Sequence, residues 1–181
     1  MTRFKVTKWL LSSAILSMSL LTVMAGAAIA PALGVIQAHF ANTSPLLIQM
    51  LISIPALFII LTSFVFPTLC RHYNTRTLVL ASLAVYVIAG SGAFFLKSLW
   101  IILILRALVG LSVGVIMPLS TGLLAFYFAP DKQAKLMGLS SSMNYLGGVV
   151  ATLITGILSN ISWNCSFLVY LMGLSAFALC A

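Results

Sequence analysis

The sequence is almost without acidic residues and is poor in charge of any kind. Only one residue, Asp131, is acidic, and charged residues make up 6% of the chain, whereas soluble domains carry roughly a quarter. So small a charged fraction cannot cover a water-exposed surface, which excludes a soluble globular protein. A single carboxylate also leaves no pair of acids for general acid–base catalysis, and we expect the protein not to be an enzyme.

Patterns of metal ligands are lacking as well. The three cysteines, Cys70, Cys165 and Cys180, are far apart in the sequence and have no spacing typical of a zinc site. The two histidines, His39 and His72, fall in different loops, and no His-Glu zinc motif occurs. We therefore expect no metal and no cofactor, and we interpret the cysteines as reduced, small apolar residues.

Long apolar runs are what the sequence does contain. Hydrophobic residues make up 62% of the chain, and a membrane-spanning helix needs about 20 apolar residues. Six segments have this length or nearly so: 9–31, 45–66, 77–96, 99–127, 136–158 and 163–181. The first run resembles a secretory signal, but it exceeds the usual signal core of roughly 7–15 residues, so we expect it to be retained. The sequence predicts an all-α integral membrane protein.

The basic residues predict the orientation of these spans. Seven of them precede the first span or lie in the loops between spans two and three and between spans four and five: Arg3, Lys5, Lys8, Arg71, Arg76, Lys132 and Lys135. The opposite side has only Lys97. Because Lys and Arg gather in cytoplasmic loops, we expect a multi-pass protein of the cytoplasmic (inner) membrane with its N-terminus inside. The net charge of +8 then reflects topology and indicates no nucleic-acid partner.

The fourth span contains the ninth basic residue, Arg106, followed at four-residue intervals by Gly110, Gly114, Pro118 and Gly122. An arginine in a span either extends to the interface to anchor the helix or faces a water-filled cavity or polar bundle interior. We favour the second interpretation. Small residues at this spacing let helices approach closely, and Pro118 removes one backbone hydrogen bond.

Two further spans have small residues at the same spacing. They are Gly26, Ala30 and Gly34 in the first span, and Gly148, Thr152 and Gly156 in the fifth. We expect both helices to approach their neighbours closely.

The fourth span reads R-x-x-x-G-x-x-x-G-x-x-x-P through Arg106, Gly110, Gly114 and Pro118. This resembles the fourth-helix motif of the major facilitator superfamily of secondary transporters. Members of that family have twelve spans in two halves, and each half is a pair of inverted three-helix repeats. The resemblance implies that residues 1–181 form the N-terminal six-helix half, and that the C-terminal half is missing from this chain.

The loop between spans two and three is similar to the family pattern G-x-L-x-D-R-x-G-R-[RK] in place but differs in detail. In "PTLCRHYNTR", Leu69 and Arg76 fit the pattern, Arg71 replaces the aspartate, and Asn74 replaces the second glycine. Asn tolerates the left-handed conformation nearly as well as Gly, whereas Arg71 reverses the charge. In the family that carboxylate helps to close the cytoplasmic gate, so the resemblance implies an altered gating loop here.

The fifth span retains part of a family antiporter motif, G-x-x-x-G-P-x-x-G-G. "GGVVATLITG" keeps Gly147 and Gly156 but lacks the proline, which weakens an antiporter assignment.

The resemblance also implies a cavity formed by spans one, two, four and five. We expect Arg106, Gln49, Asn144 and Tyr145 to line it, with ordinary hydrogen bonding between helices as the alternative for the last three. The expected function is secondary active transport of a small organic solute or drug by alternating access. Because no acid in the spans can pair with Arg106, an anionic substrate is favoured. The alternative is a half-length module that assembles with or regulates a partner membrane protein.

Overall fold

The structure is a computed structural model that describes residues 2–40, 43–96 and 98–180, with side chains from Ser12 onward except those of residues 175, 179 and 180. Lys97, the outer basic residue of the predicted topology, lies outside this part of the chain. Every regular element that the structure describes is helical. These are α1 (Thr2–Ala27), η1 (Ala30–Ala32), α2 (Leu33–His39), α3 (Pro45–His72), α4 (Thr75–Gly92), η2 (Ala93–Phe95), α5 (Leu99–Tyr127), α6 (Pro130–Ser159), η3 (Trp163–Met172) and α7 (Gly173–Cys180).

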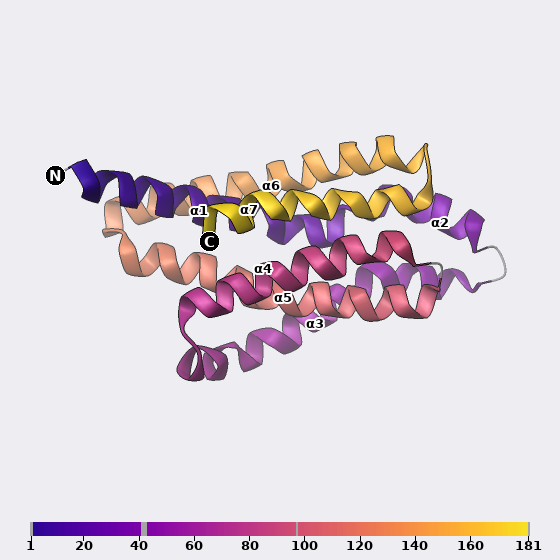
Figure 1. Cartoon of the computed structure of the whole chain (residues 1–181), viewed down its shortest axis with the longest axis horizontal. Helices are drawn as coiled ribbons and strands as arrows, with labels where there is room; N and C mark the ends of the chain where they lie inside the picture. Colours follow the sequence, from indigo (N-terminus) through magenta and orange to yellow (C-terminus); the bar gives the residue numbers. More distant parts are fainter. Residues whose placement is uncertain (1, 41–42, 97, 181) are drawn as a thin grey trace.

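The helices form one elongated bundle. In Figure 1, α1, α6 and α7 lie on one side of the bundle, and α3, α4 and α5 on the other. The N-terminus and the connections at residues 73–74 and 128–129 lie at one end, and the connection at residues 160–162 lies at the opposite end (Figure 1). Arg71, Arg76, Lys132 and Lys135 therefore gather at the end where the chain starts.

Five helical stretches are long and apolar enough to cross a membrane, and the shorter apolar segment Trp163–Ala178 follows them. This sixth segment consists of the ten residues of η3 and the first residues of α7. A 3₁₀-helix rises about 2 Å per residue against 1.5 Å for an α-helix. Trp163–Cys180 can therefore extend over roughly 30 Å, about the thickness of the hydrocarbon core.

The first helical stretch does not end at Pro31, where the predicted span ended. It continues through η1 and α2, so that the apolar helical stretch is Ser12–His39. Pro31 occupies the first turn of η1, a place that proline tolerates because the N–H groups there have no partner within the helix. Proline interrupts the α-helical hydrogen bonding here without ending the helical path.

Close approach between α3 and α5 depends on Gly110 and Gly114. A Cβ added at Gly110 would lie 2.5 Å from the carbonyl oxygen of Pro55, and one added at Gly114 would lie 2.6 Å from the Cβ of Thr62. Both distances are well below van der Waals contact, so only glycine fits at these positions. The predicted role of these two glycines in helix contact is present in the structure. Pro118 lies one turn further along α5 and is half-buried.

The contact between α1 and α6 depends on two adjacent glycines, Gly147 and Gly148, of which only Gly148 belongs to the predicted four-residue spacing. A Cβ at Gly147 would collide with the carbonyl of Leu20, and one at Gly148 would meet Val23 at 3.0 Å. The glycines Gly26, Gly34, Gly122 and Gly156 have no described atom within 4 Å of an added Cβ. The expectation of close approach at these four is wrong, because their Cα atoms do not face a neighbouring helix.

Candidate functional site

Arg106 lies inside the bundle. It is in the second turn of α5, and only 2% of its surface is exposed. Its side chain contacts the end of α1 and two aromatic rings of η3, so it does not extend to the interface. We call Arg106, Ala25, Phe167 and Tyr170 the arginine cluster.

The backbone of α1 supplies an acceptor to this cluster because the helix ends at Ala27. The carbonyls in the last turn of a helix lack partners within the helix. The carbonyl of Ala25 instead accepts from Nη1 of Arg106 at 3.4 Å and from the hydroxyl of Tyr170 at 2.9 Å. A helix C-terminus has a partial negative charge of roughly half a unit, which favours a cation at this place.

The 3₁₀ conformation of η3 brings two aromatic residues to the same guanidinium. Residues three apart lie directly above one another in a 3₁₀-helix, so Phe167 and Tyr170 point the same way. The guanidinium carbon of Arg106 lies 5.1 Å from the ring centre of Phe167 and 4.8 Å from that of Tyr170. Both distances are within the range of a cation–π interaction. The Tyr170 hydroxyl also accepts a hydrogen bond from Nη1 of Arg106.

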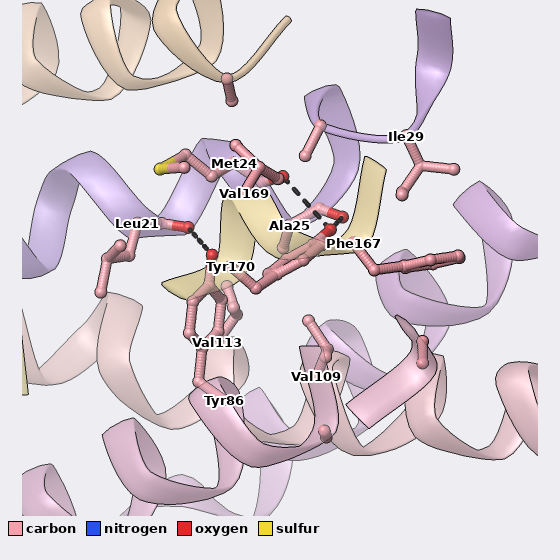
Figure 2. Close-up of a cluster of buried hydrophobic side chains, with 14 of the residues drawn as sticks. Leu21, Met24, Ala25, Ile29, Tyr86, Val109, Val113, Phe167, Val169 and Tyr170 are labelled. Carbon is pink, nitrogen blue, oxygen red and sulfur yellow. Dashed lines mark hydrogen bonds between the residues drawn. The ribbon is translucent and has the colours of Figure 1, made fainter. Parts of the chain in front are cut away.

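Tyr170 is fixed from the side of α4 as well. A Cβ at Gly90 would lie 2.5 Å from Cγ of Tyr170, so this glycine allows the ring to rest against α4. The ring centre of Tyr86 lies 5.4 Å from that of Tyr170, edge to face, and the Tyr86 hydroxyl donates to the carbonyl of Leu21 at 3.4 Å. Figure 2 shows both tyrosines pointing at α1. Their hydroxyls donate hydrogen bonds to carbonyls of α1 that are less than two turns apart.

The charge of Arg106 is not balanced by a carboxylate of this chain. Asp131, the single acidic residue, is exposed in the first turn of α6. It follows the C-terminal end of α5, and that end lies roughly 30 Å from Arg106 at the α-helical rise. Nη2 of Arg106 is buried and has no hydrogen-bond partner among the described residues. An arginine at the bilayer centre costs roughly 2.5–3.5 kcal/mol on insertion scales, and the end of α1 offsets only part of this.

Of the other three predicted cavity residues, the structure brings Asn144 close to the cluster. Asn144 accepts a hydrogen bond from the hydroxyl of Thr22, and Thr22 lies one turn before Ala25 on α1. Gln49 on α3 and Tyr145 on α6 are exposed, Tyr145 by 75%. Among the described residues, neither Gln49 nor Tyr145 forms a hydrogen bond or a ring contact with Arg106.

The predicted gating loop lies at the end of the bundle where the chain starts. Leu69 is half-buried in the last turns of α3, whereas Arg71, Asn74 and Arg76 are exposed. Asn74 precedes α4 with φ −66° and ψ 139°. The connection between α3 and α4 is extended here and does not use the left-handed conformation that Asn tolerates.

A partly open groove of about 350 Å³ lies beside this loop, between the end of α3, the start of α4 and the second half of α5. Apolar side chains, among them Phe66, Leu119 and Phe126, form most of its lining, together with Pro118 and Gly122. The groove is remote from Arg106 along α5. Among the described side chains, no group of three or more His, Cys, Asp or Glu residues could hold a metal ion.

The sequence did not identify the partners of Arg106. Phe167 and Tyr170 are three residues apart, and this spacing has meaning only if the segment is known to be a 3₁₀-helix. The carbonyl of Ala25 is a backbone group, so no side chain in the sequence marks it as a partner of Arg106. Gly90 stands outside any four-residue glycine pattern.

The comparison with known protein families gives one match. The family model described as Major Facilitator Superfamily matches residues 15–181, which includes the whole arginine cluster and every predicted cavity residue. A search of curated proteins gave no match to this chain.

Proposed function

Since this chain belongs to the major facilitator superfamily, a family of membrane transporters, we propose that it serves secondary active transport of a small organic solute by alternating access. The several apolar helices that can cross a membrane make it a multi-pass membrane protein. Beyond membership of a transporter family, we propose a mechanism and a class of substrate. The proposal assigns the handling of the substrate to the arginine cluster.

One observation supports the proposal above the others. Arg106 is a buried cation with an unpartnered Nη2 in a chain whose single acid is remote from it. Ionisable residues within a membrane are expensive, and where they occur they mark paths of substrates or ions. A carboxylate or phosphate group on the substrate would supply the missing negative charge. We therefore propose an anionic solute.

The interrupted first helix supports the same proposal. Secondary transporters build their sites from discontinuous helices whose ends point at charged groups. Here α1 ends at Ala27, and the carbonyl of Ala25 in its last turn accepts a hydrogen bond from Arg106. Asn144 contacts the same part of α1 through Thr22, so we propose it as a second substrate-binding residue. Gln49 and Tyr145 stay candidates on the exposed faces of α3 and α6.

We further propose that α1, α3 and α4 form one three-helix repeat and α5, α6 and η3–α7 its inverted copy, with a second six-helix bundle completing the transporter. The exposed faces of α3 and α6 support the proposal of a second six-helix bundle. Their large apolar side chains include Leu57, Phe64, Val149 and Leu153. A complex in native membranes with about twice the mass of this chain, or more, is expected after mild solubilisation.

Transport by variants of Arg106 tests the proposed function. Gln keeps hydrogen bonding and loses the charge, and Lys keeps the charge and loses the planar fork. In the complete transporter we expect Arg106→Gln to abolish uptake or efflux in membrane vesicles, and Arg106→Lys to restore it only in part. The measured quantity is the rate per amount of folded protein. Full activity of the Gln variant would refute the proposal.

The proposed orientation places the N-terminus in the cytoplasm. Ser98 is exposed and precedes α5 at the end of the bundle opposite to the basic loops. In a background without the native cysteines, Ser98→Cys should react with an impermeant thiol reagent added outside. Labelling from the cytoplasmic side alone would reverse the orientation.

A further inference from the structure

One end of the Arg106 guanidinium has hydrogen-bond partners, and the other has none among the described residues. Nη1 donates to the carbonyl of Ala25 and to the hydroxyl of Tyr170, which uses both of its N–H groups. Nη2 is buried and has no partner among the described residues. An arginine binds a carboxylate or phosphate end-on with one N–H from each of Nη1 and Nη2. An anion that binds in this way must therefore take Nη1 from one of its present partners.

Tyr170 is the partner that such an anion would replace. The Ala25 carbonyl is the more distant acceptor, at 3.4 Å, but it belongs to the backbone of α1 and cannot turn aside, whereas the Tyr170 hydroxyl is at the end of a side chain. When the hydroxyl leaves Nη1 it keeps an acceptor, because it already donates to the Ala25 carbonyl at 2.9 Å. Displacement therefore leaves no buried hydroxyl without a partner. It does break the polar link between η3 and α5.

We propose that Tyr170 is a positioning residue whose hydroxyl occupies the fork of Arg106 until the carboxylate or phosphate group of an anionic solute displaces it. This inference rests on the proposed function of Arg106 and adds how the site responds to its ligand. In the empty site Tyr170 holds η3 against α5. In the occupied site the anion takes its place on Nη1 and the hydrogen bond between η3 and α5 is broken, which links binding to a change in the contacts between these helices.

The chain offers a matched pair of variants. Tyr170 and Tyr86 are both fully buried, and both donate to carbonyls of α1. Tyr170→Phe removes the hydroxyl on Arg106 and keeps the ring between Gly90 and the guanidinium. Tyr86→Phe removes a hydroxyl that bonds to Leu21. A purely structural role of the hydroxyls predicts similar consequences for both variants.

The rate at which phenylglyoxal modifies Arg106 measures how often the guanidinium is free. The reaction is carried out in membrane vesicles of the complete transporter, and peptide mass spectrometry reads the modification of Arg106 relative to the exposed Arg71. We expect Tyr170→Phe to raise this ratio about tenfold, as one hydrogen bond to a charged group implies. Tyr86→Phe should leave it near the parent value. An unchanged ratio in Tyr170→Phe, or no modification of Arg106 in it, contradicts the inference.

Protection by benzoate, as a simple carboxylate, tests the displacement itself. Benzoate should slow the modification of Arg106 in Tyr170→Phe at a concentration about tenfold lower than in the parent, because no hydroxyl has to leave. Equal protecting concentrations, or no protection in either protein, would overturn the inference. Neither measurement depends on transport. These measurements can therefore refute the inference about Tyr170 without refuting the proposed function. The proposed function is tested separately by the transport rate of Arg106→Gln.

Discussion

The helix α5 contacts its neighbours in two opposite ways. Against α3 it uses Gly110 and Gly114, and the backbone of one helix lies directly on the other with no hydrogen bond between side chains among the described residues. Against α1 and η3 it uses Arg106, which contacts one carbonyl, two aromatic rings and a hydroxyl. We call the first contact the glycine interface. The glycine interface leaves no room for a larger side chain, whereas the contact through Arg106 leaves the donor Nη2 without a partner among the described residues.

The difference indicates which contact can change during the proposed transport cycle. The glycine interface is held by shape, and sliding it by one residue would bring side chains onto the backbone of α3. In the arginine cluster the acceptors are interchangeable, because a guanidinium can exchange one oxygen for another at little change in energy. We infer that α3 and α5 move as one body, and that the contacts of α5 with η3 are those that are remade.

The largest effect is expected at the glycine interface. Gly110→Leu adds a side chain where even a Cβ would lie 2.5 Å from the Pro55 carbonyl. Because backbone cannot give way as a side chain can, we expect a loss of more than about 3 kcal/mol of stability and little folded protein. The yield of monodisperse protein in size-exclusion chromatography measures this. Gly122→Leu on the same helix, where nothing lies within 4 Å, should retain the parent yield; equal losses would contradict the interface.

A smaller effect is expected where Tyr170 rests on α4. Gly90→Ala places a methyl group 2.5 Å from Cγ of Tyr170, and we expect the shifted ring to lower stability by about 1–3 kcal/mol, read as a lower midpoint of thermal unfolding in detergent. The control is Gly92→Ala, whose Cβ would meet Leu105 at an ordinary 3.7 Å. It should gain up to about 1 kcal/mol from helix propensity. A gain in both variants would show that Tyr170 is not held there.

The smallest effect is expected at the contact of α1 with α6. Thr22→Val keeps the shape of the side chain and removes the hydroxyl that bonds both to Asn144 and to the Ser19 carbonyl of its own helix. Such bonds between membrane helices contribute on average about 0.6 kcal/mol, so the unfolding midpoint should fall only slightly. Thr152→Val serves for comparison, since its hydroxyl bonds to its own helix at Gly148. A large fall of the unfolding midpoint in Thr22→Val would show that this contact is as rigid as the glycine interface.

The sequence predicted those parts of the molecule that depend on one helix at a time. The range Leu99–Tyr127 of α5 follows from apolar length and the break at Lys97 and Ser98, and the family follows from residues on that helix. Gly110 and Gly114 were indicated as contact points, although their partner α3 was not. Sequence spacing failed at Gly26, Gly34, Gly122 and Gly156, because a spacing gives a face of a helix but not the neighbour of that face.

The surroundings of Arg106 could be predicted only in part. Its position in an apolar helix indicated a cation inside the bundle, which the structure confirms, whereas its role in transport stays a prediction. The end of α1 as its acceptor depends on tertiary structure, and the pair Phe167 and Tyr170 depends on the 3₁₀ form of η3. Neither has a pattern in the sequence by which it could be recognised.

The central claim is that Arg106 is retained for function and contributes little to stability. The thermal unfolding midpoint of Arg106→Met tests it most directly. Met fills a similar volume, and the Tyr170 hydroxyl still donates to the Ala25 carbonyl, so no polar group of the cluster is left without a partner. Replacement of a buried charge by an apolar side chain is often neutral or stabilising by about 1–4 kcal/mol. We predict a midpoint equal to or above that of the parent, in a protein that no longer transports, whereas a midpoint many degrees lower would show that the guanidinium holds the bundle together and would contradict the account.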